Sequence, residues 1–278
     1  MANKVPASMA DKQKSFYKYY DRDIYAGEPE KYAKITKEPL DNSLALKIQD
    51  RNDLFLPGDL PGEFGWWLLD DGTALIANQT FFPDVTGEMF DWWFAWHPID
   101  RLRYACWDNE DHYDVYLEDY DHALDMSLTM QERHWGSIHH VWEDAGTGSS
   151  DLITIWFKKP SEMGYDESKI GTDACNALIC ANAAIIGNDQ MPDTPVVMTH
   201  FLRPAEGGSV LRSRFWIGWQ VIDGKAVKCL PDGARVPEIA PISLLNHNVK
   251  EFSNLTKILP SIYAEEKDHW SVESTIIK

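Results

Sequence analysis

A histidine and a glutamate lie four residues apart near the C-terminus, at His247 and Glu251. The surrounding segment, PEIAPISLLNHNVKEFSNLTKIL, is predicted to be a helix, and this spacing places both side chains on one face. The same face carries Leu244, Leu255 and Ile258, so it should pack against the core. An imidazole and a carboxylate are costly to bury unless they pair, meet a third partner or bind a metal ion. The pair is therefore the first candidate for chemistry.

Three other ionisable side chains are predicted to point inward from apolar faces. His97 ends a helix predicted over PDVTGEMFDWWFAWHP, whose apolar side is mostly tryptophan. Glu132 follows alternating apolar residues in MSLTMQERHW, which we interpret as a strand, and His200 shares a strand face with aliphatic side chains. Imidazole nitrogen and carboxylate oxygen are ordinary zinc ligands. Together with His247 and Glu251, these residues indicate a divalent metal site.

Each of these residues also has a structural interpretation. An inward histidine can be a hydrogen-bonded core residue, and His247 and Glu251 can form a satisfied buried pair. Glu132 can lie at a strand end that reaches solvent. The acidic runs WDNEDHYD and YLEDYDH lack the glycine and the spacing of a calcium-binding loop, so we interpret them as solvated loops. Three further histidines on less clear strand faces are interpreted as structural: His134, His139 and His140.

The composition excludes several classes of protein. The 278 residues are 44% hydrophobic, which suits a folded globular chain, and the 12 tryptophans suggest an aromatic core or an aromatic-lined pocket. A net charge of −18 argues against nucleic-acid and anionic-membrane partners. No apolar run has the length of a membrane span, and the N-terminus lacks the apolar core of a signal peptide, so we expect a cytoplasmic protein. The four cysteines form no CxxC pair and are expected to be free thiols.

The order of predicted elements indicates an α+β fold. Residues 1–55 are polar and tyrosine-rich and are interpreted as an arm or small cap, and residues 56–278 as one catalytic domain. Hairpin turns are predicted at Asp70-Asp71-Gly72, at residues 146–150 and at Gly207-Gly208, and residues 102–222 are interpreted as successive strands. A long C-terminal helix follows, which Pro260 should kink or end. A run of antiparallel strands before a long helix suggests a sheet that curls round that helix.

Signatures of several common enzyme classes are missing. The sequence has no G-x-S-x-G nucleophile elbow, no Walker loop, no G-x-G-x-x-G and no HExxH. A serine hydrolase, a nucleotide-binding enzyme and a zinc protease of the HExxH type are therefore disfavoured.

Three segments carry a family resemblance. The stretch MFDWWFAWHPIDRLRYACWDNEDHY, the MTHFLRP strand and the LLNHNVKEF helix resemble the phloretin hydrolase and 2,4-diacetylphloroglucinol hydrolase family, over about residues 60–265. The resemblance implies a zinc-dependent hydrolase that cuts the carbon–carbon bond between an acyl group and a phloroglucinol ring. It also implies a helix-grip, Bet v1-like catalytic domain and a homodimer.

The resemblance also implies a set of zinc ligands. It assigns His97, His247 and Glu251 as ligands of Zn2+, and it makes Glu132 the favoured fourth ligand. Glu143, in HHVWEDAG, is the main competitor of Glu132 for that position.

The resemblance implies a substrate pocket as well. His200 would be a histidine of the pocket that does not bind zinc, and we hypothesise that it is the catalytic residue that relays a proton. Trp93 and Trp96, near His97, would stack on the aromatic ring of a ketone substrate. Asp100 would contact the substrate, at a position where an amide is expected in some relatives. The acyl group stays open, since phloretin and mono- or diacetylphloroglucinol all fit the chemistry.

Two other functions compete with this one. Helix-grip folds often only enclose apolar ligands, so a non-enzymatic binding protein for aromatic small molecules is the main alternative. A metal-free aromatase or cyclase is a weaker one. Zinc content separates the hydrolase from the binding protein, and indifference to chelators would mark the cyclase.

Overall fold

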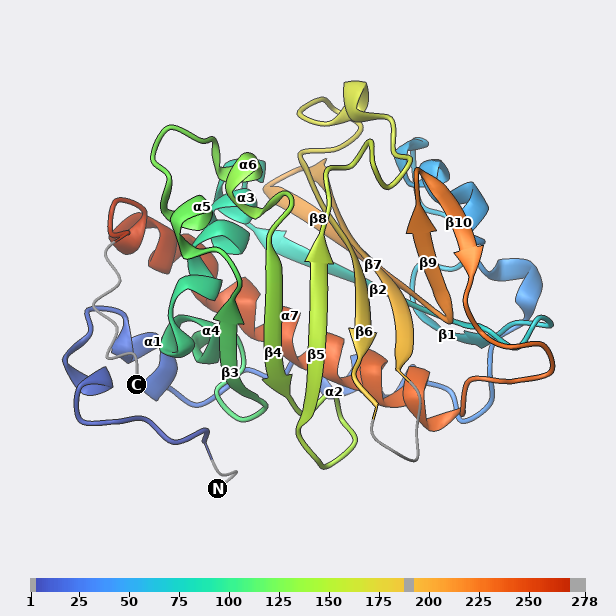
Figure 1. Ribbon diagram of the computed structural model, residues 1–278, viewed down its shortest axis with the longest axis horizontal. Helices are drawn as coiled ribbons and strands as arrows, with labels where there is room; N and C mark the ends of the chain where they lie inside the picture. Colours follow the sequence, from blue (N-terminus) through green and yellow to red (C-terminus); the bar gives the residue numbers. More distant parts are fainter. Residues whose placement is uncertain (1–3, 188–192, 271–278) are drawn as a thin grey trace.

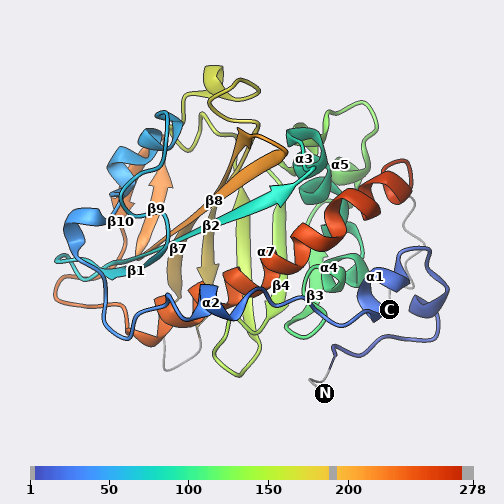
Figure 2. The same ribbon diagram turned by 180° about the vertical axis from the view of Figure 1, so that it is seen from behind.

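One long helix lies along one face of an antiparallel sheet in the computed structural model, which describes residues 4–187 and 193–270 (Figures 1 and 2). The sheet has eight strands in the order β1-β2-β8-β7-β6-β5-β4-β3, and β9 pairs with β10 in a separate small sheet. The strands are β1 (Gly65–Leu68), β2 (Ala74–Pro83), β3 (His112–Leu117), β4 (Ile138–Glu143), β5 (Asp151–Phe157), β6 (Ala177–Ile185), β7 (Thr194–Ala205), β8 (Gly208–Ile217), β9 (Trp219–Ile222) and β10 (Lys225–Lys228). The helices are α1 (Tyr17–Asp21), α2 (Pro29–Tyr32), α3 (Gly87–Trp96), α4 (Arg101–Trp107), α5 (Tyr120–Leu124), α6 (Met130–His134) and α7 (Ile239–Glu266), with short 3-10 turns that include η3 (Ile48–Phe55).

The three predicted hairpins are confirmed. They join β1 to β2, β4 to β5 and β7 to β8, and each pair is antiparallel. The first turn needs its glycine, because Gly72 has φ 85° and a Cβ atom there would approach the carbonyl oxygen of Ala234 to 2.3 Å. These hairpins fix the register of the paired strands, and the register decides which side chains point to the inner face of the sheet.

Helix α7 supplies the central part of the core. Its 28 residues bury an apolar stripe that includes Leu245, Val249, Phe252 and Leu255, and this stripe packs against β2, α3 and β1. The helix continues past Pro260 to its end at Glu266, so the proline does not end it. The predicted α+β arrangement, a sheet curled round a long C-terminal helix, is confirmed.

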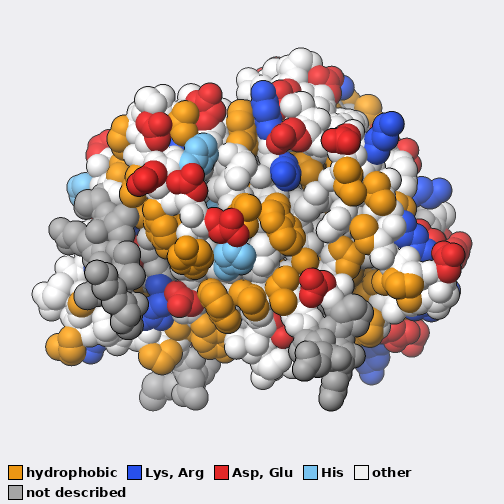
Figure 3. All heavy atoms as spheres, viewed as in Figure 1, with side chains coloured by type: hydrophobic (Ala, Val, Ile, Leu, Met, Phe, Trp, Pro, Cys, Tyr) orange, Lys and Arg blue, Asp and Glu red, His pale blue; other side chains and the backbone are white. Residues whose placement is uncertain are grey.

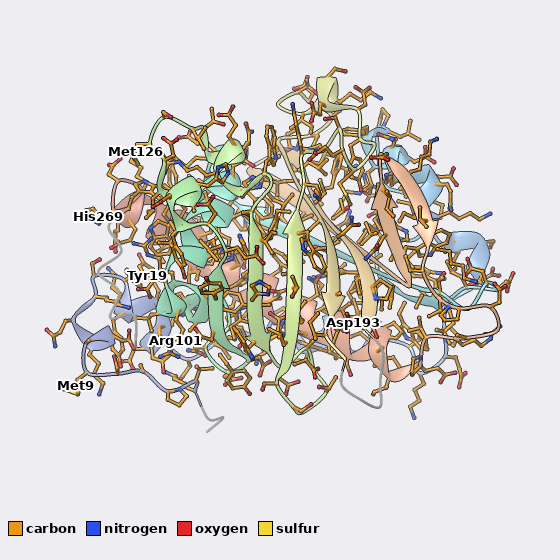
Figure 4. The ribbon with its side chains drawn as sticks, in the orientation of Figure 1. Met9, Tyr19, Arg101, Met126, Asp193 and His269 are labelled. Atoms are coloured by element: carbon orange, nitrogen blue, oxygen red, sulfur yellow. The ribbon has the colours of Figure 1, made fainter. Side chains whose placement is uncertain are left out.

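Three segments within the range predicted as successive strands are helices, and one of them is α5. Residues Arg101–Trp107 form α4, which begins at Asp100, whose carboxylate accepts a hydrogen bond from the Leu102 amide. Residues Met130–His134 form α6, because Thr129 and Glu132 make a reciprocal capping box. Met126, predicted to face the interior, is 65% exposed and lies at the periphery (Figure 4).

The described part of the N-terminal arm packs on the main domain. Helix α1 lies against α4, where Tyr19 and Tyr20 join the main core, and α2 lies against α7. Arg101, labelled in Figure 4, donates to the carbonyl oxygen of Pro6 and lies 3.4 Å from the Asp11 carboxylate. The arm therefore has no core of its own, as expected, while the boundary at residue 55 stays a prediction.

The two faces of the sheet are covered differently. Helix α7 packs on the inner face, mainly against β2 and β1, and η3 with the β9–β10 pair covers the outer face of β7 and β8. The outer face of β3 and β4 exposes Tyr116 and Trp142, and Figure 3 shows hydrophobic side chains mixed with acidic and histidine side chains there. The four cysteines are free thiols, as predicted. Over the described ranges, no helix has both the length and the apolar character that crossing a bilayer requires.

Candidate metal centre

Four ionisable side chains from three elements converge beneath the sheet, and all of them are buried except Glu143, which is half-buried. His112 begins β3, Glu143 ends β4, and His247 and Glu251 come from one face of α7. His112 Nε2 lies 3.4 Å from His247 Nε2 and 3.7 Å from an oxygen of Glu143 and from an oxygen of Glu251. His247 Nε2 lies 3.9 Å from the other oxygen of Glu143. These distances place two nitrogens and two carboxylates around one small volume, which we call the four-residue cluster.

A β-bulge brings His112 into the four-residue cluster. Strict alternation counted back from the buried Val115 and Leu117 would point Tyr113 inward and His112 outward. The pairing with β4 shifts register between His112 and Asp114, so His112 turns inward and is fully buried. Sequence patterns do not reveal this histidine, because it lies in an acidic run and strict alternation along the strand would point it outward.

Alternation does place Glu143. On β4 the side chains of His139 and Val141 are buried, and Glu143 follows them on the same face. Glu143, named above as the competitor for the fourth ligand position, is the glutamate that reaches the cluster.

Hydrogen bonds with neighbouring groups orient three of the four side chains: His112, Glu143 and Glu251. His112 Nδ1 faces the carbonyl oxygen of Tyr104 at 3.3 Å, so Nδ1 carries the proton and Nε2 offers a lone pair to the cluster. The Tyr104 hydroxyl donates to Glu143, and the Asn248 amide donates to Glu251 at 2.8 Å. Metal-binding histidines and carboxylates are commonly held by such outer contacts. The donor set and its support therefore fit a divalent metal ion.

The pKa values reflect carboxylates and imidazoles buried together. Burial, reinforced by His247, holds the pKa of His112 well below its usual range. Burial and the Glu143 carboxylate raise the pKa of Glu251 to about 8, against the opposing effect of His247. Burial lowers the pKa of His247, but Asp111, Glu251 and Glu143 outweigh it and raise the pKa to about 10. These groups therefore strongly stabilise a positive charge placed among them. A bound cation can supply that charge as well as a protonated histidine can.

A second acidic group lies behind His247 and surrounds a lysine ammonium. The Lys250 ammonium lies 3.2 Å from Asp108, 2.9 Å from Glu110 and 2.7 Å from Asp111. Asp111 in turn lies 3.8 Å from His247 Nδ1. Asp108, Asp111 and His247 could geometrically hold an ion, but the lysine occupies the acidic side of that group. We interpret these residues as support for His247.

A mostly apolar cavity adjoins the four-residue cluster. Glu143, His247 and Glu251 line it together with Tyr104 and Trp107. Three further imidazoles line it: His97, His139 and His200. The remaining lining side chains are aromatic or aliphatic: Phe94, Phe157, Phe215, Val141, Ala145, Ile153, Ile155, Ala183, Ile185, Val196, Met198 and Leu244. A polar end beside an apolar chamber is typical of a site for a small aromatic ligand.

The structure brings together only part of the predicted ligand set. His247 and Glu251 share one helix face and meet in the cluster, as expected. His97 lines the cavity but lies outside the cluster, and its Nδ1 bonds to the Trp93 carbonyl oxygen at 2.7 Å. Glu132 is exposed, with its carboxylate on the Thr129 amide and hydroxyl, so its predicted inward position is wrong.

The predicted catalytic histidine lies in the cavity. His200 is buried, its Nδ1 lies 3.0 Å from the Ser213 hydroxyl, and burial lowers its pKa to about 3. It is therefore a neutral imidazole at physiological pH.

The three predicted substrate contacts lie outside the cavity lining. Trp93 is fully buried behind His97, with 5.3 Å between ring centroids. Trp96 stacks on Trp92 within the core. Asp100 caps α4 and pairs with Lys14 at 2.7 Å. Each is held by structural contacts, and Trp107, which the sequence analysis did not single out, is the tryptophan that lines the cavity.

Comparisons with known proteins show which family this chain is similar to. The family model of the DAPG hydrolase PhiG domain matches residues 44–264. The chain is 40% identical over 269 residues to phloretin hydrolase of Eubacterium ramulus, covering 95% of each chain. It is 30% identical over 249 residues to a 2,4-diacetylphloroglucinol hydrolase of a Pseudomonas species, covering 84% of this chain and 82% of that one. Among solved structures it is similar to Ara h 8.0201, with 10% identity, a TM-score of 0.41, and coverage of 68% of this chain and 99% of that one.

Proposed function

The chain belongs to the DAPG hydrolase PhiG domain family, and from that premise we propose that it is a zinc-dependent hydrolase that cleaves the aryl–acyl carbon–carbon bond of an acylphloroglucinol. The observation that carries this proposal is the four-residue cluster at the polar end of an aromatic-lined cavity. Relatives named for phloretin and for diacetylphloroglucinol support a phenolic ketone as substrate.

The proposed ligands of the zinc ion are His112, Glu143, His247 and Glu251. This set replaces His97 by His112 and Glu132 by Glu143, because only these side chains reach the cluster. Two imidazoles and two carboxylates are ordinary zinc ligands. When bound, such an ion polarises a carbonyl group and lowers the pKa of water from about 16 towards 7. Tyr104 holds the Glu143 carboxylate in place through its hydroxyl.

The reaction uses the ring as the leaving group. In its keto tautomer, an acylphloroglucinol joins acyl group and ring as a β-dicarbonyl unit. Water adds to the acyl carbon, the bond from that carbon to the ring breaks, and the electron pair is delocalised as a ring enolate. A proton then reaches the ring carbon, so the products are a carboxylic acid and the shortened phenol. The apolar cavity favours this route, because it binds the neutral aromatic ring and excludes bulk water.

We propose that His200 moves the proton. Its imidazole is neutral, Ser213 orients Nδ1, and the other nitrogen can accept a proton from the attacking water and return it to the ring carbon. His200→Ala should keep the metal ion and lose roughly two to four powers of ten in kcat, the usual size of such an effect. His140→Ala is the matched control, since His140 lies on the outward face and bonds to Glu118 at 2.9 Å. Unchanged turnover in His200→Ala would remove His200 from the mechanism.

The decisive experiment is an assay with two candidate substrates. The protein is incubated with phloretin and with diacetylphloroglucinol, with and without a chelator, and the released acids and phenols are quantified. We expect about one zinc ion per chain and product formation that chelation abolishes and zinc restores. A metal-free preparation that binds these compounds without cleaving them would instead favour the aromatic-ligand binding protein. Activity that a chelator does not affect would favour metal-free chemistry.

The identity of the acyl group is a finer proposal. Isoleucines and leucine line the apolar part of the cavity, where an arylpropionyl arm would bury more surface than an acetyl group. We therefore propose phloretin as the first substrate to compare. Homodimer formation and a cytoplasmic location stay predictions, which size-exclusion chromatography and cell fractionation would test.

A further inference from the structure

Two imidazoles of the cavity have no role in the proposed chemistry. His97, at the end of α3, and His139, on β4, both line the cavity and are both buried. Their ring centroids are 6.4 Å apart, with the rings nearly perpendicular at 81°. Each ring is tethered through one nitrogen, so the proton position on each can be worked out.

The tautomer of His97 follows from its tether. Its Nδ1 lies 2.7 Å from the backbone carbonyl oxygen of Trp93, which can only accept a hydrogen bond. Nδ1 therefore carries the proton and Nε2 carries a lone pair. Within the described residues, no group donates to this Nε2, and it is not one of the fully enclosed polar atoms.

The tautomer of His139 follows from a chain of two bonds. The Ser137 hydroxyl donates its single proton to the carbonyl oxygen of His134 at 2.7 Å. The Ser137 hydroxyl oxygen also lies 3.0 Å from His139 Nε2. Because its proton is already donated, this oxygen accepts a hydrogen bond from Nε2. Nε2 of His139 thus carries the proton, and Nδ1 carries a lone pair that meets no donor in the described part of the chain.

Both rings stay neutral at physiological pH, and their surroundings are apolar. Burial lowers the pKa of His97 to about 3 and holds the pKa of His139 well below its usual range. Phe94 packs edge-on against His97 at 5.4 Å, and Phe157 lies 4.4 Å from His139. Two fixed acceptors in an apolar chamber favour a ligand that brings donors, because an unmet buried acceptor is costly.

We propose that His97 Nε2 and His139 Nδ1 accept hydrogen bonds from two hydroxyl groups of the substrate ring, so that the site selects a ring with free hydroxyls in 1,3 relation. This inference rests on the proposed function, because it assumes that the cavity binds the phenolic ring. It assigns His97 to ring recognition instead of the metal ligation expected from the sequence. A ring that lacks the second hydroxyl would leave one acceptor unmet, and a site built for hydrogen bonds discriminates strongly against such analogues.

Binding of three simple phenols tests the inference without any turnover. Affinities of the zinc-loaded protein for phloroglucinol, resorcinol and phenol are measured by ligand-observed NMR. We expect resorcinol to bind about tenfold or more tightly than phenol, as one buried hydrogen bond implies. The variants His97→Phe and His139→Phe keep an aromatic ring and remove the acceptor. In each of them, the ratio of resorcinol affinity to phenol affinity should fall to within about twofold of unity.

Conservative variants separate recognition from packing. His97→Gln and His139→Asn keep an acceptor near the position of the lost nitrogen and should restore most of the resorcinol preference. His140→Phe, on the outward face, should leave the ratio unchanged. A wild-type protein without the preference, or Phe variants that retain it, would overturn the inference. Because the ratio is a binding measurement, absence of hydrolysis would count against the proposed function and not against this inference.

Discussion

Two clusters of buried charge lie on opposite faces of the same sheet, and they are built in opposite ways. On the outer face, Arg212 and Arg214 of β8 share the carboxylate of Glu63 at 2.5 and 2.6 Å. On the inner face, the four-residue cluster holds its charged atoms 3.4–3.9 Å apart, with nitrogen facing nitrogen. Alternation along β8 separates the two faces, since Ser213 between the arginines contacts His200 in the cavity.

The difference teaches how a structural cluster can be told from a functional one. Burial raises the pKa of Glu63, but the two arginines outweigh it and lower the pKa to about 2, so its charge is fully compensated by protein. Glu251 has a pKa raised to about 8, so its charge is not compensated. The outer cluster is complete as protein, while the inner one leaves a negative charge that the proposed cation would compensate.

The largest expected effect comes from breaking the inner cluster. His247→Ala removes a nitrogen ligand from the centre of the proposed set, so metal binding and activity should be lost together. We expect kcat/KM to fall by at least about a thousandfold, because metal chemistry supplies several kcal/mol. Zinc content by elemental analysis and initial rates measure the two losses. A variant that stays zinc-loaded and fully active would defeat the assignment.

Breaking the outer cluster should affect stability without affecting the chemistry. Glu63→Gln leaves two buried guanidinium groups without their carboxylate, which should lower the free energy of unfolding by about 3 kcal/mol at pH 7. Urea denaturation measures the loss, and kcat per folded molecule should stay at the wild-type value. Equal free energies of unfolding for wild type and Glu63→Gln at pH 7 would show that the outer ion pairs do not stabilise the fold.

The pH dependence of that loss has a definite sign. The pKa of Glu63 is lowered from 4.5 to about 2 in the folded protein, so its stabilisation is complete above about pH 4.5. As the pH falls towards 2, the unfolded chain takes up the proton first and the stabilisation disappears. The difference in free energy of unfolding between wild type and Glu63→Gln should therefore shrink as the pH falls from 4.5 to 2. A difference that stays constant over this range would contradict the ionic origin.

In the inner cluster, loss of a carboxylate should change the stability of the protein, and the direction of the change should depend on whether the metal ion is bound. Without metal, Glu251→Gln removes a buried carboxylate whose pKa is raised, while its amide oxygen can still accept from Asn248. We expect the metal-free variant to be more stable than the wild type by about 1 kcal/mol at pH 8. With zinc present the variant should be the less stable one, because it binds the ion more weakly. Thermal melts with chelator and with zinc test this inversion, and the same sign in both would refute it.

Periodicity alone made much of the fold and the His247–Glu251 pair predictable, and alternation along β4 also places Glu143. The three hairpins follow from apolar runs around Gly and Asp, and the i, i+4 spacing on α7 joins His247 to Glu251. His112 could not be found in this way, because the bulge at the start of β3 reverses the side to which it points. The burial of Arg212 and Arg214 could likewise not be predicted, because their partner Glu63 lies 149 and 151 residues away in the sequence.

Local structure favours Glu143 over Glu132 as the proposed fourth ligand, and the test of this choice has the smallest expected effect. Alternation over MSLTMQERHW points Glu132 inward, but the Thr129–Glu132 capping box forms a short surface helix first. Glu132→Ala should therefore lower Tm by at most about 2 °C, through loss of the cap, and leave zinc content and kcat unchanged. Glu143→Ala is the matched variant on β4, and it should lose the metal ion. Reduced zinc in Glu132→Ala, or full zinc in Glu143→Ala, would return the fourth ligand to the surface helix and undo the contrast between the two clusters.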